Sequence, residues 1–349
     1  MAMKAAVFHR PGQIALEHRD VYDVGDDEIL LQIRAASICG TDLRIYKDGH
    51  FKIPEGCSRV LGHELAGVIV KVGRLVSGYR EGMRISLTPN IGCGHCEICR
   101  QGYNNMCPDY TVFGISVDGG FQEYMRIPSS AIRGNNIFEL PDPLSFPEAA
   151  VVEPLSCCYN GLKVLDPTPE DSVLIIGSGP IAACFVQLAK TWGARQVIVV
   201  GRRPSRLAEM ERFGPDIVID SSKLDLLAEV RRITRGRGVD VVVTAASSPE
   251  LQPLALQLLA IHGRVNFFGG LRKGTRVEIE TNLAHYKGLR LTGTTGASNE
   301  DYFRSLRLVA DGRIDLKAIV SHTFALADIN AAFEFAQSGE GLKMLVLHE

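Results

Sequence analysis

Apolar residues follow two different patterns along the 349-residue chain, and the change falls near residue 151. Beyond that point, short apolar runs alternate with stretches of helical character. The runs are VLII from residue 173, VIVV from 197, VDVVV from 239 and VNFF from 265. Strands buried on both faces of a parallel sheet have this composition, and the helices between them form the crossover connections. The pattern therefore predicts an α/β domain with a doubly wound parallel sheet.

The residues before 151 predict a different architecture. They contain short β-favouring runs separated by turn sequences such as Pro11-Gly12 and Asp118-Gly119-Gly120. This is typical of an irregular all-β or α+β lobe. The β-favouring runs are 4–9, 28–35, 65–72, 84–87 and 121–127.

The pattern changes again after about residue 293. Helices are expected at 301–311 and 328–337, and a strand at 343–348. No neighbouring sequence offers that strand a sheet partner, so we expect the C-terminus to return to the first lobe. The chain length fits two domains. The expected boundaries are 1–152 for the first lobe and 153–293 for the parallel sheet, with 294–349 as the returning segment.

Composition and charge narrow the function classes. Apolar residues make up 46% and charged residues 22% of the chain, which is an ordinary globular composition. The formal net charge is −2, so no strong basic field is available for nucleic acid or an anionic membrane. The uncharged stretch between Asp171 and Lys190 is interrupted by Gly177-Ser178-Gly179-Pro180. That interruption predicts a strand turning into a helix, and we expect no membrane span. The N-terminus shows no apolar signal segment, so we expect a cytoplasmic protein with reduced cysteines.

A glycine motif follows the first apolar run directly. Gly177-x-Gly179-x-x-Ala182 opens a helical stretch that begins with Pro180 and Ile181. The first glycine allows a tight turn, the second lets the backbone approach a pyrophosphate, and Ala182 permits close helix–strand packing. The helix N-terminus offers free N–H groups to the phosphates. Such glycines alone also occur in unrelated turns, but in this context the motif predicts a Rossmann domain that binds NAD(P).

The end of the second apolar run bears on which dinucleotide binds. A carboxylate there normally binds the ribose 2′-OH of NAD, whereas arginine accommodates the 2′-phosphate of NADP. This chain has Gly201 followed by Arg202 and Arg203, whose guanidinium groups suit bidentate phosphate contacts. The alternative interpretation is a solvated helix start. We favour NADP over NAD.

Four cysteines lie close together in the sequence Cys93-x2-Cys96-x2-Cys99-x7-Cys107. Four thiolates close a tetrahedral shell around Zn²⁺, so we predict a structural zinc lobe at about residues 90–108. A ferredoxin run, C-x2-C-x2-C-x3-C-P, begins in the same way. Here, however, seven residues precede the last cysteine, and the run is not duplicated. A zinc shell filled by sulfur leaves no open position for a substrate.

A second set of metal-binding residue types is dispersed along the chain as Cys39, His63, Glu64 and Glu153. Each is ambiguous alone, because a single cysteine is most often a core residue and Gly-His-Glu is a common turn. Together they offer a thiolate, an imidazole and a carboxylate, which matches a catalytic zinc site with an open position. The remaining carboxylate would orient a ligand or exchange with it. Which glutamate is the third ligand stays open.

These motifs, in this order, resemble the zinc-containing medium-chain dehydrogenase/reductase family, closest to its sorbitol (polyol) and threonine dehydrogenase branch. The resemblance covers essentially the whole chain. It implies a β-rich GroES-like catalytic domain beside the Rossmann domain, and a homodimer or homotetramer. The motifs that carry it are CGTD at 39–42, GHELAGVIVKVG at 62–73, the four-cysteine loop, VEPLSC at 152–157 and GSGPIA at 177–182.

The resemblance also implies roles for individual residues. Thr41 matches a hydroxyl that relays the substrate proton, Asp42 a carboxylate near the ligand histidine, and Tyr46 an aromatic residue lining the substrate site. The implied ligands of the catalytic zinc are Cys39 and His63, completed by Glu64 or Glu153.

Some positions depart from the family pattern. Arg44 stands where many members have a histidine that passes the proton to solvent. Residues 293–296, Gly-Thr-Thr-Gly, stand where animal sorbitol dehydrogenases place an Arg-Tyr pair. Gly201 replaces the acidic residue of NAD-using members. Lys343 either reaches the cofactor pyrophosphate or is a solvated side chain.

We therefore expect a zinc- and NAD(P)-dependent enzyme that interconverts a secondary alcohol and a ketone, with a polyol or sugar alcohol as its small-molecule partner. Two zinc ions per chain are expected, one catalytic and one structural. One alternative is a non-catalytic structural or sensing protein that binds the nicotinamide cofactor. Another is a dehydrogenase for threonine or a sugar-alcohol phosphate. The presence of all four dispersed ligand candidates favours the enzyme.

Overall fold

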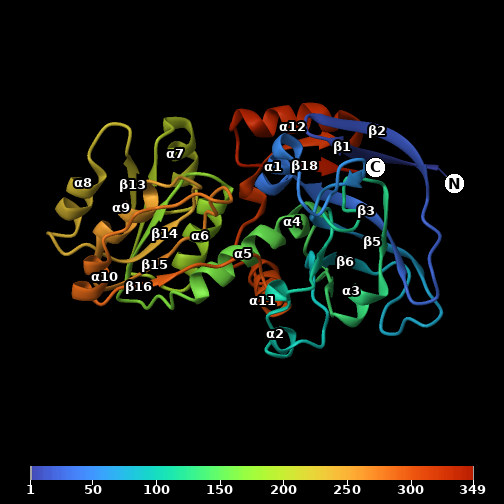
Figure 1. Cartoon of the computed structure of the whole chain (residues 1–349), viewed down its shortest axis with the longest axis horizontal. Helices are drawn as coiled ribbons and strands as arrows, with labels where there is room; N and C mark the ends of the chain where they lie inside the picture. Colours follow the sequence, from blue (N-terminus) through green and yellow to red (C-terminus); the bar gives the residue numbers. More distant parts are fainter. Residues whose placement is uncertain (1, 349) are drawn as a thin grey trace. The chain divides into compact units, whose positions relative to one another are not determined.

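The computed structural model describes residues 2–348 and divides the chain into two compact units. Unit 1 comprises residues 1–156 and 296–349, so it holds both ends of the chain, and unit 2 comprises residues 157–295 (Figure 1). Helix α5 (Val152–Lys163) crosses from one unit into the other. Among the described residues, no helix combines the length and the apolar character needed to cross a bilayer.

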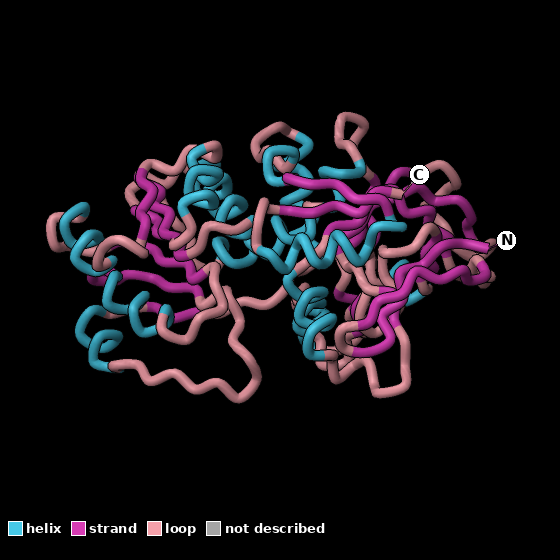
Figure 2. The backbone as a smooth tube through the Cα atoms, turned by 90° about the horizontal axis from the view of Figure 1, so that it is seen from above, coloured by secondary structure: helices cyan, strands magenta, loops and turns pink. Residues whose placement is uncertain are grey.

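Unit 2 contains a six-stranded parallel sheet with the strand order β13-β12-β11-β14-β15-β16. The chain runs outward from β11 in one direction and then in the other, with helices between the strands (Figures 1 and 2). The predicted doubly wound sheet is confirmed. Its strands are β11 (Ser172–Ile176), β12 (Gln196–Gly201), β13 (Ile217–Asp220), β14 (Val239–Thr244), β15 (Leu259–Asn266) and β16 (Arg290–Thr292). Its helices are α6 (Pro180–Thr191), α7 (Pro204–Glu211), α8 (Leu226–Ile233), α9 (Leu251–Leu258) and α10 (Thr281–Lys287).

The strands of unit 2 form where the sequence is most apolar because this sheet is covered on both faces. All five residues of β11 are buried, and so are the five residues of β12 that follow its first position. A core of apolar side chains from these strands and from α8 and α9 holds the sheet together. The glycine motif lies at the carboxyl end of β11, at the point where the strand order reverses, which is the usual ligand-binding position of such sheets.

Unit 1 is built on a mixed sheet with the strand order β10-β6-β5-β3-β18-β17, in which β9 also pairs with β3. A three-stranded sheet, β2-β1-β4, and a two-stranded ribbon, β7-β8, complete its strands. The strands are β1 (Ala2–Arg10), β2 (Gln13–Asp20), β3 (Ile29–Ser37), β4 (Arg59–Val60), β5 (Glu64–Val72), β6 (Arg84–Leu87), β7 (Asn90–Ile91), β8 (Thr111–Val112), β9 (Tyr124–Ile127), β10 (Ile137–Glu139), β17 (Val320–Ala325) and β18 (Lys343–Leu347). The helices besides α5 are α1 (Gly40–Asp48), α2 (Glu97–Arg100), α3 (Ser129–Arg133), α4 (Phe146–Ala150), α11 (Asn299–Ala310) and α12 (Ile329–Ser338).

The last strand of the chain completes the sheet of the first lobe. Strand β18 pairs antiparallel with β3 and parallel with β17. Ser37, at the end of β3, lies opposite Leu345 of β18 on one side and opposite Glu64 of β5 on the other. The end of β3, the start of β5 and the start of β18 therefore lie side by side, at the same end of these three neighbouring strands. Helix α1 begins three residues after Ser37, at that same end.

Candidate metal centres and cofactor site

The four clustered cysteines come together in the lobe beside the β7-β8 ribbon. Their sulfur atoms lie within 4.8 Å of one another, and Cys96 Sγ is 3.9 Å from Cys107 Sγ. Four sulfurs at 2.3 Å from one zinc ion would be about 3.8 Å apart, so this spacing fits the ion. Gly92 permits the tight wrap, because a Cβ there would lie 2.7 Å from Cys99 Sγ. Backbone N–H groups of His95 and Cys96 lower the pKa of Cys93 to about 6, which favours the thiolate that zinc binds.

Cys39, His63 and Glu64, three of the four dispersed ligand candidates, also come together. Their ligand atoms lie within 4.8 Å of one another. Cys39 immediately precedes α1, His63 immediately precedes β5, and Glu64 is the first residue of β5. Cysteine, histidine and glutamate are all established zinc ligands, so the donor set fits the metal.

Asp42 contacts the segments that carry Cys39 and His63. Its carboxylate is fully buried and accepts hydrogen bonds from the backbone N–H groups of Cys39, at 2.9 Å, and Gly62, at 3.2 Å. Asp42 Oδ1 is also 3.5 Å from His63 Nδ1, which has no hydrogen-bond partner. Burial opposes charging of the His63 ring, but the charges of Asp42 and Cys39 outweigh it and raise the pKa of the imidazole. Because Nδ1 faces Asp42, Nε2 is the nitrogen left for a metal.

Glu64 is held by groups that the sequence did not point to. Lys343, only 4% exposed, places its Nζ 2.5 Å and 2.8 Å from the two carboxylate oxygens of Glu64. The same ammonium donates to the carbonyl of Ile38 at 3.0 Å, and the Ser37 hydroxyl donates to Glu64. Burial raises the pKa of Glu64 to about 7, against the opposing charge of Lys343. Lys343 is therefore neither solvated nor free for a pyrophosphate. Only the strand pairing of β18 with β3 reveals this contact.

The other predicted residues of unit 1 lie around this set. Glu153, in the first turn of α5, is buried, and its charge helps to raise the pKa of Glu64. It does not belong to the tight group of ligand atoms. The Thr41 hydroxyl accepts a hydrogen bond from Arg44 Nη2 at 3.0 Å. Tyr46 packs its ring against Phe333, 5.4 Å between centroids, and donates its hydroxyl to the carbonyl of Gly12. Its role toward a substrate stays a prediction.

In unit 2 the glycine motif and the end of β12 line one cavity of about 480 Å³. Gly177 has φ +144 and lies against Ala245, where a Cβ would be 3.2 Å from that residue. Gly179 immediately precedes α6, Pro180 and Ile181 form the first turn of the helix, and Ala182 is buried. The cavity wall includes Gly177, Ser178, Gly179, Gly201, Arg202, Arg203 and Arg206.

Two features of this cavity refine the sequence interpretation. A Cβ at Gly201 would lie 2.6 Å from Ser178 Oγ, so an acidic side chain could not stand there without displacing the glycine loop. Arg206 is a third arginine that the sequence reasoning missed. Its Nη1 comes within 3.4 Å of the Cβ position of Gly179. It stands four residues after Arg202 in the first turn of α7, and that spacing was the available signal.

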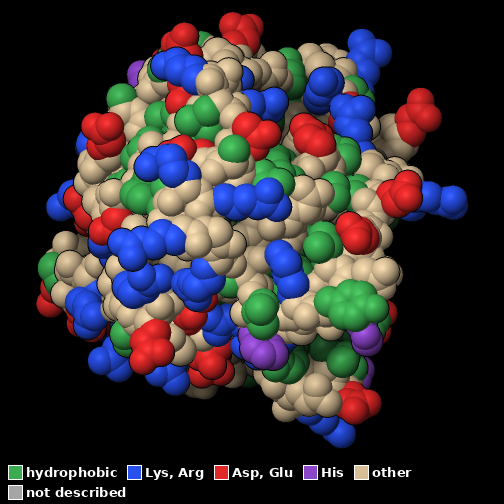
Figure 3. All heavy atoms as spheres, turned by 90° about the vertical axis from the view of Figure 1, so that its left-hand side faces the viewer, with side chains coloured by type: hydrophobic (Ala, Val, Ile, Leu, Met, Phe, Trp, Pro, Cys, Tyr) green, Lys and Arg blue, Asp and Glu red, His purple; other side chains and the backbone are tan. Residues whose placement is uncertain are grey.

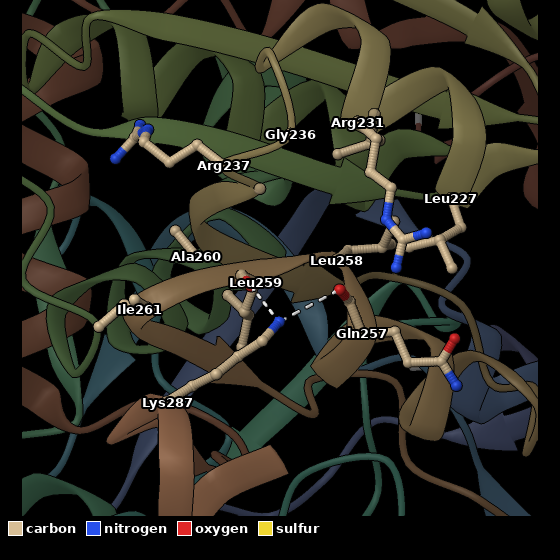
Figure 4. A pocket seen from close by; sticks show the side chains of 12 residues that line it. Leu227, Arg231, Gly236, Arg237, Gln257, Leu258, Leu259, Ala260, Ile261 and Lys287 are labelled. Atoms are coloured by element: carbon tan, nitrogen blue, oxygen red, sulfur yellow. Dashed lines mark hydrogen bonds between the residues drawn. The ribbon is translucent and has the colours of Figure 1, made fainter.

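A larger cavity of about 570 Å³ lies elsewhere in unit 2 (Figure 4). It is lined by the end of α8 and the amino ends of β14 and β15, so it opens at the sheet edge opposite the glycine motif. Lys287 Nζ crosses it to donate to the carbonyl of Leu259 at 2.7 Å. Ligands of doubly wound sheets bind at the carboxyl ends of the strands, so the cavity at the glycine motif is the cofactor candidate. Figure 3 shows Lys and Arg side chains mixed with Asp and Glu on the outer face of unit 2, which is not a face of one sign.

Comparison with known proteins supports the resemblance inferred from the motifs. Residues 25–140 match the alcohol dehydrogenase GroES-like domain, and residues 180–311 match the zinc-binding dehydrogenase domain. The chain is 32% identical to sorbitol dehydrogenase of Bacillus subtilis (strain 168), over 99% of this chain and 97% of the relative. It is 33% identical to L-threonine 3-dehydrogenase of Pyrococcus horikoshii, over 99% and 98% of the two chains.

A solved structure of a zinc-binding dehydrogenase from Sinorhizobium meliloti 1021, bound to NADP, matches 99% of this chain and 99% of its own. The TM-score is 0.91 at 31% identity. The predicted combination of a GroES-like domain with a Rossmann domain is thereby confirmed. The chain belongs to the zinc-containing medium-chain dehydrogenase/reductase family, close to its polyol and threonine dehydrogenases.

Proposed function

We propose that this chain interconverts a secondary alcohol and a ketone by hydride transfer, using zinc and a nicotinamide dinucleotide, with a polyol or sugar alcohol as substrate. The observation that carries the proposal is the convergence of Cys39, His63 and Glu64 within 4.8 Å. A protein that only bound the cofactor would have no need for that set. Similarity to a sorbitol dehydrogenase over nearly the whole chain supports the polyol class.

Several residues of unit 1 would each have a separate role in the reaction. Zinc, when bound, supplies a Lewis acid that stabilises negative charge on the oxygen of the alcohol. Cys39 and His63 would hold the ion, with Asp42 keeping the imidazole in place. Thr41 would accept a hydrogen bond from the alcohol O–H, and as it takes up that proton its own hydroxyl proton would pass to solvent water. Unit 2 would bind the dinucleotide, whose nicotinamide ring accepts the hydride.

The third protein ligand of the catalytic zinc is Glu64 or Glu153. Glu64 lies in the tight group of ligand atoms, but Lys343 contacts both of its oxygens, so a metal must compete with that ammonium. Glu153 is buried nearby and is the alternative. Metal analysis of Glu64→Gln and Glu153→Gln separates the two. The variant that loses half of the zinc identifies the ligand.

We favour NADP as the cofactor. Gly201 leaves no room for an acidic side chain, and Arg202, Arg203 and Arg206 line the same cavity as the glycine loop. Guanidinium groups are suited to bind a 2′-phosphate, whereas the carboxylate that normally binds a free 2′-OH is replaced by Gly201 at the end of β12.

The four-cysteine lobe would hold a second, structural zinc ion. The spacing of its four sulfur atoms supports this assignment. The homodimer or homotetramer and the cytoplasmic location stay predictions.

The decisive experiment compares Cys39→Ser with Cys57→Ser in a panel of alditols, each with NAD⁺ and NADP⁺. Cys57 is an exposed cysteine outside both metal groups, so it is the matched control. We expect Cys39→Ser to lose turnover and one zinc equivalent while still binding the dinucleotide, and Cys57→Ser to behave as wild type. Full turnover of zinc-free wild-type protein would refute the mechanism. Dinucleotide binding without oxidation of any alcohol by the zinc-loaded wild type would favour the non-catalytic alternative.

A further inference from the structure

Arg44 lies on the same turn of α1 as Thr41, the residue that would contact the reacting hydroxyl. Its side chain is exposed, and Nη2 donates to Thr41 Oγ1 at 3.0 Å. Thr41 in turn lies two residues from Cys39. Arg44 therefore contacts Thr41 directly, and Thr41 would in turn contact the hydroxyl group of the substrate.

The charge of Arg44 is not neutralised by the protein. No ion pair among the described residues joins Arg44 to a carboxylate. The nearest carboxylate on its own helix turn, Asp42, is buried and faces Cys39, Gly62 and His63 instead. An exposed cation beside a small-molecule site, with no counterion from its own chain, can take one from a ligand.

The neighbouring groups reinforce this positive field. Lys52 follows α1 on the next loop, and its Nζ donates to the carbonyl of Tyr110 at 2.8 Å and stands 3.6 Å over the ring of Tyr110. Neither contact removes its charge. Burial together with the charges of Lys52 and Arg44 lowers the pKa of the His50 ring. His50 is accordingly neutral at pH 7, and the local charge comes from Arg44 and Lys52.

Arginine also excludes one role at this position. A guanidinium has five N–H donors and no acceptor, and it does not lose a proton in proteins. Arg44 therefore cannot take a proton from Thr41. Arg44 donates one N–H to the oxygen of Thr41. The other N–H donors of Arg44 remain for a planar or tetrahedral anion.

We infer that Arg44 binds an anionic group of the substrate, so that the preferred substrate is an alcohol carrying a phosphate or a carboxylate, such as an alditol phosphate or an aldonate. This rests on the proposed function and specifies its substrate class. Phosphate and carboxylate share the chemistry that a guanidinium recognises, bidentate acceptance of N–H donors. The anion would lie beside Thr41, close to the carbon that is oxidised.

The test measures kcat/KM with sorbitol, sorbitol 6-phosphate and gluconate for wild type, Arg44→Gln and Lys47→Gln. Lys47 is an exposed cation on the same helix and supplies the control for a loss of charge alone. Hydrogen bonds to charged groups predict that wild type favours an anionic substrate by about 10–100-fold over sorbitol. Arg44→Gln should lose most of that preference, mainly through a higher KM for the two anionic substrates. Lys47→Gln should keep the preference.

A second readout does not depend on turnover of an anionic substrate. Inorganic phosphate should inhibit sorbitol oxidation competitively in wild type, and Arg44→Gln should weaken that inhibition at least tenfold. The phosphate and carboxylate substrates distinguish which anion the site takes. Sorbitol oxidised as well as both anionic alcohols, or equal losses on all three in Arg44→Gln, would overturn the inference and leave the proposed function standing. No alcohol oxidised by zinc-loaded wild type would overturn both.

Discussion

Replacing Lys343 by methionine tests how much the buried contact between Lys343 and Glu64 stabilises the strands that carry them, β18 and β5. Methionine keeps much of the length of the side chain but removes the ammonium that contacts both oxygens of Glu64 and the carbonyl of Ile38. The exposed fraction of Lys343 is 4% and that of Glu64 is zero, so the pair is shielded from bulk solvent. The variant leaves a buried carboxylate whose remaining partner is the hydroxyl of Ser37.

The magnitude follows from burial. Removing one partner of a buried ion pair costs about 3–5 kcal/mol, because the other charge stays buried without compensation. Glu64 limits this loss by taking up a proton, which is accessible because its pKa is already raised to about 7. We therefore expect about 3 kcal/mol of local destabilisation at pH 7.5, which corresponds to a roughly hundredfold larger equilibrium constant for opening of the strands that carry the pair.

Hydrogen–deuterium exchange resolved by peptide is the suitable assay, because it reports each strand separately. Amides of β3, β5 and β18 should exchange roughly a hundredfold faster in Lys343→Met, and those of β11 in unit 2 should not change. Lys343→Arg keeps a cation and should lose less. Lys71→Met is the control in the same strand as Glu64, since Lys71 is half exposed and its 3.9 Å pair with Asp23 is a surface contact. Exchange in Lys343→Met that matches Lys71→Met would refute the reasoning.

Three further predictions follow from other contacts. Arg202→Ala should raise KM for NADP⁺ at least tenfold and leave KM for NAD⁺ within about twofold, because it removes a guanidinium suited to the 2′-phosphate; equal effects in parallel steady-state assays would exclude that role. Cys96→Ser should lower the zinc content by one equivalent per chain and reduce the melting temperature, as measured by metal analysis and calorimetry, and retention of both ions would contradict a four-thiolate site. His348→Met should stabilise the chain, because both ring nitrogens of His348 are buried without a hydrogen-bond partner. Burial lowers the pKa of His348 to about 3, so in wild type stability is lost as pH falls below 6.5. The gain in unfolding free energy should be about 2 kcal/mol larger at pH 5 than at pH 8, and a gain independent of pH would contradict this.

The sequence determined the features that depend on local chemistry. Four cysteines on one short loop cannot lie far apart, so their spacing alone predicted a metal lobe. The glycine motif between an apolar strand and a helix predicted its own turn and the fold around it. In unit 2, strands covered on both faces must be apolar throughout, and their runs could be identified without a structure. Strand β2 was missed because it carries His18, Arg19 and Asp20 on a half-exposed surface, where no apolar run forms.

Tertiary structure decided which distant side chains share a site. Lys343 and Glu64 are 279 residues apart, and only the insertion of β18 beside β3 brings their charges together. The sequence could name Cys39, His63, Glu64 and Glu153 as candidates, but their relative distances depend on where β3, β5 and α5 meet. It likewise could not show that Arg206 joins Arg202 and Arg203 in one cavity. Local motifs are encoded by neighbours within a turn or a strand, whereas a catalytic set depends on strand pairing between distant segments, which no short stretch of sequence specifies.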